Sequence, residues 1–289
     1  MQLTARAKIN LALHVTDQRS DGFHMLDTLV TFADVGDTLS FEPATKLSLT
    51  IDGPEADQLP GDENNLVLRA AETLRRHCGR SDLGATIHLT KNLPVASGIG
   101  GGSADAAAAM MGLNQLWDLQ LSKAHMMQIS LPLGADIPMC ISSVPAQITG
   151  IGEVINKLPI PPLNLVLVNP RAPLSTPDVF RQLETKKNSA LGELQRYEYR
   201  SDRFWINHLL HQRNDLQQAA CALEPKVADC LAVLERNPDC MIARMSGSGA
   251  TCFGIFENPG EAAFAAHRLR HEFKDWWIMP TRTIAGQSI

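Results

Sequence analysis

The chain has 289 residues, enough for two domains that each bury a core, which excludes a small fold stapled by disulfides. Its 26 Lys and Arg residues against 31 Asp and Glu residues give a formal charge of −5 with no long run of one sign, so we expect no nucleic-acid partner. Polar residues interrupt the apolar ones throughout, so no segment approaches the roughly 20 apolar residues of a membrane span. Because the N-terminus also lacks the apolar core of a secretory signal, we expect a soluble, cytoplasmic protein that does not bind membranes.

Cysteine and histidine spacing does not indicate a metal site. The six cysteines lie far apart without a CxxC pair, which argues against zinc knuckles and redox dithiols and favours buried free thiols. His267 and His271 are four residues apart on an expected helix, but Arg268 stands where a zinc protease has Glu. We therefore expect an exposed helix face there and predict no protein metal ligand.

The first 90 residues are predicted to be rich in β-strands. Apolar residues alternate with other residues from position 9 to 15, the pattern of a half-buried strand, so Lys8 and Asn10 are expected on the face directed away from the core. Asn64 or Asn65 can cap a helix that follows. The predicted elements in chain order are strands at 9–15, 25–42 and 46–51, a helix at 65–78 and a strand at 85–90.

A glycine-rich loop at 94–102 is predicted to lead into an Ala-rich helix from about 104 to 117, capped by Ser103. A second helix is expected from Ser122 to Leu131. The prolines from Pro159 to Pro162 indicate a linker, which predicts domains at 1–158 and 159–289.

The second domain is expected to be ferredoxin-like. Leaving extra helices aside, its elements follow the order βαββαβ, and a polar stretch at 185–203 is expected to be a loop. The predicted elements are a strand at 163–168, a helix starting at Thr176, helices at 205–212, 214–222 and 225–236, strands at 240–245 and 250–256, a helix at 260–273 and a strand at 276–284. The fold class is therefore α+β with two domains, the first of which mixes β-strands and helices.

The segment from Pro94 to Ala104 carries the clearest chemical signal. Its four glycines let backbone N–H groups approach a ligand, and the start of a helix adds the positive end of its dipole, so phosphate is the expected guest. The segment is not a Walker loop, since no Gly-Lys-Ser/Thr closes it, and Ser103 takes the third glycine position of a dinucleotide fold. A tight turn between strand and helix is the alternative.

Three further candidates are ambiguous on their own. Asp136 lies in the connector Leu133–Pro138 and is either functional or a helix cap. Lys8 is either functional or solvated. The segment Ser246–Ala250 joins two strands and is either a hairpin turn or a second loop beside phosphate.

Taken in order, these segments resemble the family of galactokinase, homoserine kinase, mevalonate kinase and phosphomevalonate kinase. The resemblance spans residues 5 to about 255, with two departures: Ala96-Ser97 replace glycine, and Asp105 stands where Asn is frequent. The segments that carry it are Ala7-Lys8-Ile9-Asn10-Leu11, Asp21-Gly22-Phe23-His24, Glu63-Asn64-Asn65-Leu66, Pro94–Ala104, Leu133–Pro138 and Ser246–Ala250.

The resemblance implies transfer of the γ-phosphoryl group of ATP to a hydroxyl of a small molecule. The Lys-Ile-Asn-Leu and Asp-Gly-Phe-His segments are similar to those of members that act on a cytidylated alcohol in the non-mevalonate route to isoprenoid precursors. In that case Asp136 is the catalytic base, and the ammonium of Lys8 keeps it ionised and orients the hydroxyl. The residues implied in ATP binding are Pro94, Val95, Ala96, Ser97, Gly98, Ile99, Gly100, Gly101, Gly102, Ser103 and Ala104.

The resemblance also implies an acceptor site in which Phe23 and His24 stack on and hydrogen-bond to cytosine while Phe180 covers its other face. The implied substrate-binding residues are Asn10, Phe23, His24, Thr176 and Phe180. Core packing is the alternative for both phenylalanines. We expect Mg²⁺ to be held largely by the nucleotide, with Ser103 either a contact or an ordinary cap.

Two other functions remain open. One is a kinase of the same family that acts on homoserine or a mevalonate derivative, against which Asp-Gly-Phe-His argues. The other is a nucleotide-binding regulator without catalysis, against which the presence of Lys8 and Asp136 argues. A dehydrogenase that binds NAD is disfavoured, because both elements of its fingerprint are missing.

Overall fold

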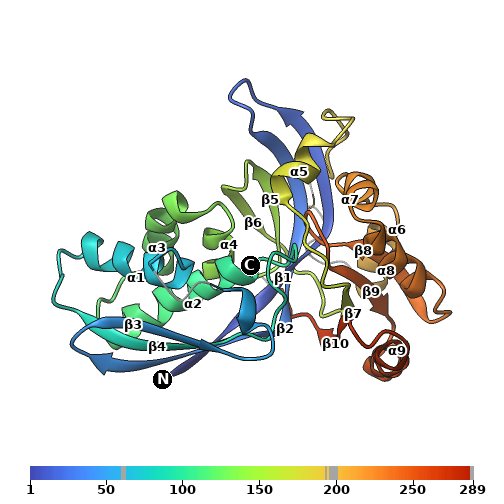
Figure 1. Ribbon diagram of the computed structural model, residues 1–289. Helices are drawn as coiled ribbons and strands as arrows, with labels where there is room; N and C mark the ends of the chain where they lie inside the picture. Colours follow the sequence, from blue (N-terminus) through green and yellow to red (C-terminus); the bar gives the residue numbers. More distant parts are fainter. Residues whose placement is uncertain (60–62, 193, 195–200, 287–289) are drawn as a thin grey trace. The chain divides into compact units, whose positions relative to one another are not determined.

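The computed structural model describes residues 1–59, 63–192, 194 and 201–286 (Figure 1). They form two compact units, each assembled from separate chain segments. Unit 1 comprises residues 1–7, 36–95 and 100–143, and unit 2 comprises residues 8–35, 96–99 and 144–289. The domain boundary predicted between residues 158 and 159 cuts the chain once, whereas the two units exchange segments several times; that boundary remains a prediction.

Two long paired strands, β1 (Gln2–Gln18) and β2 (His24–Ala44), run through both units. The strand predicted at 9–15 is present within β1, but it is not half-buried: residues 7–15 are buried on both faces, with Lys8 and Asn10 only 6% and 3% exposed. The backbone of Ile99 and the side chain of Ser246 lie against the face expected to point away from the core, since they accept hydrogen bonds from the amides of Lys8 and Asn10. A solvated role for Lys8 is therefore wrong.

In unit 1, the end of β2 forms a sheet with β3 (Leu47–Asp52) and β4 (Gly84–Thr90); β4 is antiparallel to β2 and parallel to β3. Helix α1 (Leu66–His77), capped by Asn65, packs against α2 (Gly101–Leu116), which contacts α4 (Ile137–Ser142). Helix α3 (Lys123–Ser130), capped by Ser122, also contacts α4. Short 3₁₀ turns lie at Ala56–Gln58 and Leu131–Leu133.

Close packing of α2 on the sheet requires a glycine. A Cβ at Gly112 would lie 2.4 Å from the ring of Phe41, which is buried in β2. Five of the other buried residues of α2 are alanines, at positions 104 and 106–109, which bring the helix close to its neighbours.

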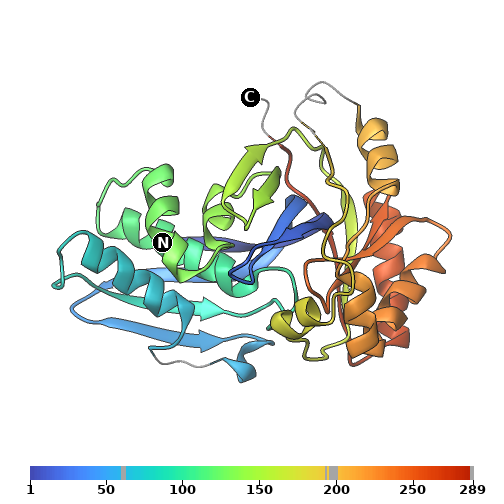
Figure 2. The ribbon, with the colours of Figure 1, turned by 90° about the horizontal axis from the view of Figure 1, so that it is seen from above.

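In unit 2, a four-stranded antiparallel sheet has the order β10-β7-β9-β8. Its strands are β7 (Asn164–Asn169), β8 (Cys240–Met245), β9 (Cys252–Phe256) and β10 (Trp277–Arg282). Helices α8 (Pro225–Glu235) and α9 (Pro259–Glu272) pack on it (Figure 2). The predicted βαββαβ order is confirmed, because β7, α8, β8, β9, α9 and β10 follow one another in the chain and the four strands form one sheet. Apolar residues of these elements form one buried cluster.

Unit 2 also contains elements outside that sheet. The helices are α5 (Thr176–Arg181), α6 (Asp202–Leu210) and α7 (Gln217–Leu223). Strands β5 (Ala146–Gly150) and β6 (Val154–Lys157), which the sequence analysis did not predict, pair with each other, and β5 pairs with the start of β2. In the predicted loop at 185–203, the described residues from 185 to 192 contain no helix or strand, and residues 193 and 195–200 lie outside the described part.

The cysteines are free thiols, of which Cys140, Cys230 and Cys252 are buried and the others half-buried. His267 and His271 lie on an exposed face of α9, as predicted. Across the described residues, no three His, Cys, Asp or Glu side chains gather as a metal cage, and no helix has the length and apolar character to cross a membrane.

Candidate active site

The glycine-rich segment is divided between the two units. Its residues 96–99 belong to unit 2, and the residues on either side belong to unit 1. Helix α2 begins at Gly101 rather than at Ala104, because Gly100 adopts the left-handed conformation (φ +66°) and accepts the first helical hydrogen bond from Ala104 at 2.8 Å. The predicted cap role of Ser103 is therefore wrong, and Ser103 lies inside the first turn.

This first turn has the properties of an anion site. The backbone N–H groups at the start of a 16-residue helix lack helical partners and carry the positive end of its dipole. A Cβ at Gly102 would meet no atom of the described residues within 4 Å, so the backbone there is open to a ligand. A Cβ at Gly101 would lie 3.4 Å from Lys91 Nζ.

Lys91 lies beneath that turn in a buried ion triad that the sequence analysis missed. Its Nζ lies 2.5 Å from Asp37 Oδ2 and 2.8 Å from Asp105 Oδ2, and all three side chains are at most 4% exposed. Asp37 Oδ1 also accepts hydrogen bonds from the amides of Asn92 and Leu93. The triad thereby ties the end of β4 to the first turns of α2.

Burial acts in opposite directions on the pKa values of Lys91 and Asp105. Burial raises the pKa of Asp105 to about 8, because it outweighs the attraction of Lys91 and acts together with the nearby Asp37 carboxylate. Burial alone would lower the pKa of Lys91, but the carboxylates of Asp105 and Asp37 raise it above its usual value. Among the described residues, Asp105 Oδ1 has no hydrogen-bond partner. The sequence signal for this triad is the lysine at the strand end that precedes the glycine-rich segment.

In unit 2, Lys8 and Asn10 lie on β1 beside two loops. The Lys8 amide donates to Ile99 O at 2.8 Å, and the Asn10 amide donates to Ser246 Oγ at 3.0 Å. The Asn10 side chain donates from Nδ2 to Thr28 Oγ1 at 2.8 Å. Asn10 Oδ1 is buried and accepts no hydrogen bond from the described residues, which leaves it available to a hydroxyl group.

The loop Ser246–Ala250 packs against Gly98 of the glycine-rich segment. Ser246 Oγ donates to Gly98 O at 3.2 Å, and a Cβ at Gly98 would lie 2.5 Å from Ser246 O and 2.6 Å from Gly249 O. This close approach of two backbones explains Gly98, which the sequence analysis had counted among the glycines needed by a ligand. Ser246–Ala250 therefore does not only connect two strands, since it also packs against the glycine-rich segment.

Thr176, His24 and Phe180 also lie in unit 2. Thr176 Oγ1 is 2.6 Å from Ser248 Oγ, which ties the start of α5 to the same loop. The rings of His24 and Phe180 stack with centroids 4.7 Å apart, which leaves no room for a base between them. Burial and then Lys186 lower the pKa of His24, whose Nε2 has no partner among the described residues. Phe23 is 59% exposed, so it is not a core residue, whereas Phe180 packs against the apolar cluster of unit 2.

Asp136 lies in unit 1, directly before α4, and its side chain does not cap that helix. The cap role left open for it is therefore wrong. Lys8 lies in unit 2, so the pairing of Lys8 with Asp136 stays a prediction.

Two family models match the chain. The GHMP kinases N terminal domain matches residues 65–144, and the GHMP kinases C terminal domain matches residues 189–275. Together they cover the first turn of α2, Asp136 and the loop Ser246–Ala250.

Curated proteins named 4-diphosphocytidyl-2-C-methyl-D-erythritol kinase are similar over nearly the whole length. One from Rhizobium etli (strain CIAT 652) is 50% identical over 98% of this chain and 94% of its own. One from Cereibacter sphaeroides is 49% identical over 96% of this chain and 97% of its own.

Solved structures agree. A crystal structure of 4-(cytidine 5'-diphospho)-2C-methyl-D-erythritol kinase superposes with a TM-score of 0.81 at 29% identity, covering 99% of this chain and 100% of that one. Homoserine kinase from Cytophaga hutchinsonii shares the fold, with a TM-score of 0.72 at 18% identity over 100% of this chain and 95% of that one. The chain therefore belongs to the GHMP kinases and, within them, to the family of 4-diphosphocytidyl-2-C-methyl-D-erythritol kinases.

Proposed function

We propose that this protein transfers the γ-phosphoryl group of ATP to the 2-hydroxyl of 4-diphosphocytidyl-2-C-methyl-D-erythritol, giving the 2-phosphate and ADP. The observation that carries the proposal is the 50% identity to a kinase of that name over 98% of the chain. The fold class and the ATP-dependent kinase family agree with it. The reaction belongs to isoprenoid precursor biosynthesis by the methylerythritol phosphate route, and we infer a cytoplasmic location.

Phosphoryl transfer needs an in-line hydroxyl, an acceptor for its proton and compensation of the phosphate charge. In the proposed mechanism, Asp136 accepts the proton of the 2-hydroxyl as the oxygen attacks the γ-phosphorus. The Lys8 ammonium stabilises the ionised Asp136 and orients the hydroxyl. The backbone amides in the first turn of α2, where the chain is open to a ligand at Gly102, bind the ATP phosphates and offset their charge.

The acceptor is proposed to bind along β1 and α5 of unit 2. Asn10 Oδ1, buried without a partner among the described residues, accepts a hydrogen bond from a hydroxyl of the erythritol moiety. Thr176 borders the same site through Ser248. Because His24 and Phe180 already contact each other, the cytosine ring is proposed to pack on the outside of this stack, beside the exposed Phe23, rather than between the two rings.

Mg²⁺ is proposed to arrive with ATP. It binds oxygen ligands, keeps several waters and is usually held by phosphates with one or two protein oxygens. The carboxylates of Asp37 and Asp105 do not fit this role, since both are buried against Lys91. Ser103, in the first turn of α2, is the hydroxyl that fits best.

ADP release in the presence of Mg²⁺ and ATP tests the proposal. The acceptors to compare are the cytidylated methylerythritol, unmodified methylerythritol phosphate, homoserine and mevalonate. Turnover of the cytidylated compound alone is expected. Turnover of homoserine or mevalonate instead would support another kinase of the family, and ATP binding with four inert acceptors would support a regulator without catalysis.

A further inference from the structure

The side chain of Asn214 is hydrogen-bonded to Met245, the last residue of β8, and to Gly247 of the loop at 246–249. Its Nδ2 donates to Met245 O and to Gly247 O, each at 2.8 Å, and its Oδ1 accepts from Leu216 N at 2.9 Å. The residue is only 7% exposed. Both N–H groups of the amide are therefore used on backbone carbonyls, a pattern that a carboxylate of the same shape cannot reproduce.

The loop that Asn214 holds contacts three of the predicted site residues of unit 2, namely Asn10, Gly98 and Thr176. Ser246 Oγ accepts from the Asn10 amide and donates to Gly98 O, and Ser248 Oγ pairs with Thr176 Oγ1. A shift of this loop would therefore move contacts to residues assigned to acceptor binding and to the glycine-rich segment.

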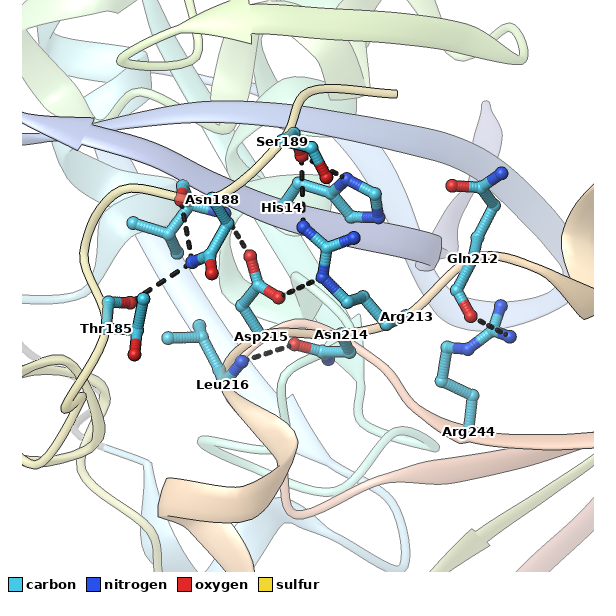
Figure 3. A network of polar contacts seen from close by, with 11 residues as sticks. His14, Thr185, Asn188, Ser189, Gln212, Arg213, Asn214, Asp215, Leu216 and Arg244 are labelled. Atoms are coloured by element: carbon cyan, nitrogen blue, oxygen red, sulfur yellow. Dashed lines mark hydrogen bonds and ion pairs between the residues drawn. The ribbon is translucent and has the colours of Figure 1, made fainter. Parts of the chain in front are cut away.

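Asn214 itself rests on a rigid base. The residues on either side of it are hydrogen-bonded to β1: Leu13 N donates to Arg213 O, and Asp215 N donates to Leu13 O. The Asp215 carboxylate accepts from Arg213 Nε at 2.6 Å (Figure 3). It also accepts from Val15 N at 2.7 Å. These contacts fix the backbone of Asn214 relative to β1, so its side-chain amide holds the loop from a fixed position.

We propose that Asn214 is a positioning residue of the kinase reaction, which fixes the loop at 246–249 in the geometry that binds the acceptor. It acts through the carbonyls of Met245 and Gly247 and through Ser246 and Ser248, which contact Asn10 and Thr176. This inference rests on the proposed function for its kinetic consequence, but its structural part, the order of the loop, can be measured without any substrate.

The proposal has a specific kinetic signature. When the hydrogen bonds to the loop are lost, a smaller fraction of free enzyme has the competent loop geometry, and the apparent affinity for the acceptor falls by that fraction. Saturating acceptor restores the geometry, so kcat changes little. A residue that only stabilised the fold would instead lower the melting temperature and leave the KM of the folded fraction unchanged.

Asn214→Asp and Gln217→Glu form a matched pair for the test. Both replace an amide by a carboxyl group. Gln217 Oε1 accepts from Met245 N at 3.0 Å, so a carboxylate there keeps its bond, whereas even a protonated carboxyl at position 214 donates one bond in place of two. We expect Asn214→Asp to raise the KM for the cytidylated acceptor about tenfold or more with kcat within about threefold, and Gln217→Glu to behave as wild type.

Hydrogen–deuterium exchange of peptides covering residues 243–256 in the ligand-free protein supplies the second readout. Faster exchange in Asn214→Asp than in Gln217→Glu supports the proposal. Equal KM and exchange in the two variants, or a loss of melting temperature with unchanged KM, overturns it. If Asn214→Asp does not fold, Asn214→Ser, which keeps one donor, replaces it, and its KM for the cytidylated acceptor should exceed that of Gln217→Glu; an equal KM overturns the proposal. If the wild type does not phosphorylate the cytidylated acceptor, the proposed function fails and the exchange comparison alone decides the role of Asn214.

Discussion

Lys91 Nζ lies 2.8 Å from Asp105 Oδ2 in a buried contact beneath the first turn of α2. A second carboxylate, that of Asp37, shares the same ammonium. Two acids compete for one base away from water, so the charge state of Asp105 is set by burial as much as by its partner.

We predict that Asp105→Asn makes the protein more stable than the wild type at alkaline pH. The pKa of Asp105 is raised to about 8 in the folded protein from 3.8 in the unfolded chain, so the folded state holds the extra proton between these values. The stabilisation from protonated Asp105 is complete below about pH 4 and is lost as the pH rises through about 8. Asn keeps the shape of the side chain but does not ionise. The unfolding free energy of the variant relative to wild type should therefore rise by about 1 kcal/mol or more from pH 5 to pH 9.

Urea unfolding of both proteins at pH 5, 7 and 9 measures this difference. A difference in unfolding free energy that stays constant across the three pH values would show that Asp105 does not titrate in this range.

Substitution by alanine is predicted to lower stability at Gly98 but not at Gly102. A Cβ at Gly98 would overlap the backbone of Ser246 and Gly249 at a residue with φ +74°, so Gly98→Ala should lose stability and activity together. A Cβ at Gly102 meets no described atom within 4 Å, and alanine is the better helix former. Gly102→Ala should therefore fold at least as stably as wild type but raise the KM for ATP, because the methyl group obstructs the phosphates.

Thermal melting and ATP kinetics of the two variants separate these effects. A normal KM for ATP in Gly102→Ala would argue against phosphate binding at this turn.

Asp136→Asn is predicted to lower kcat by about 10² or more with KM values near those of wild type, as expected when a positioned base is lost. Single-turnover measurements at saturating ATP and acceptor report the chemical step. Asp229→Asn, on an exposed position of α8, is the matched control and should keep full activity. Turnover near the wild-type rate in Asp136→Asn would refute the role of Asp136 as base.

Phe180→Ala is predicted to raise the KM for the cytidylated acceptor and to spare the KM for ATP. The ring stacks on His24, so its loss removes the support of the ring against which the base is proposed to pack. Loss of one stacked aromatic corresponds to about 1–3 kcal/mol of binding free energy. The control is Phe264→Ala, because Phe264 is 62% exposed on α9. Equal losses for the acceptor and for ATP would contradict a base-binding role.

Periodicity and capping residues were sufficient to predict most of the fold. The strand at 9–15, a helix cap at Asn64 or Asn65, the helix that starts near Ser122 and the βαββαβ order of unit 2 all rest on local signals, and each of these elements is present. The start of α2 was predicted three residues late, because Ser is the usual cap, whereas here a left-handed glycine takes that place. Strands β5 and β6 are short and carry no strong alternation, so only their pairing with β2 and with each other defines them.

The candidate site was predictable where a motif marks a backbone conformation and unpredictable where residues meet through the fold. Lys91, Asp37 and Asp105 come from three separate segments, and no spacing rule brings them together. The same holds for Asn214 and the carbonyl of Met245. Gly98 was predicted as a ligand-binding glycine, but a neighbouring backbone can require glycine equally well. Only the contact with Gly249 shows that the backbone is the reason here.

The buried cluster of unit 2 joins Leu13 near the start of the chain to Ile278 near its end. During synthesis β1 leaves the ribosome before the rest of this cluster, and the residues that complete the cluster, in α9 and β10, are made last. At roughly 5–20 residues per second, β1 waits on the order of 10–60 s for them. Over that interval the nascent chain exposes the apolar residues of a strand that has no completed core to enter, which makes it a candidate for chaperone binding during translation.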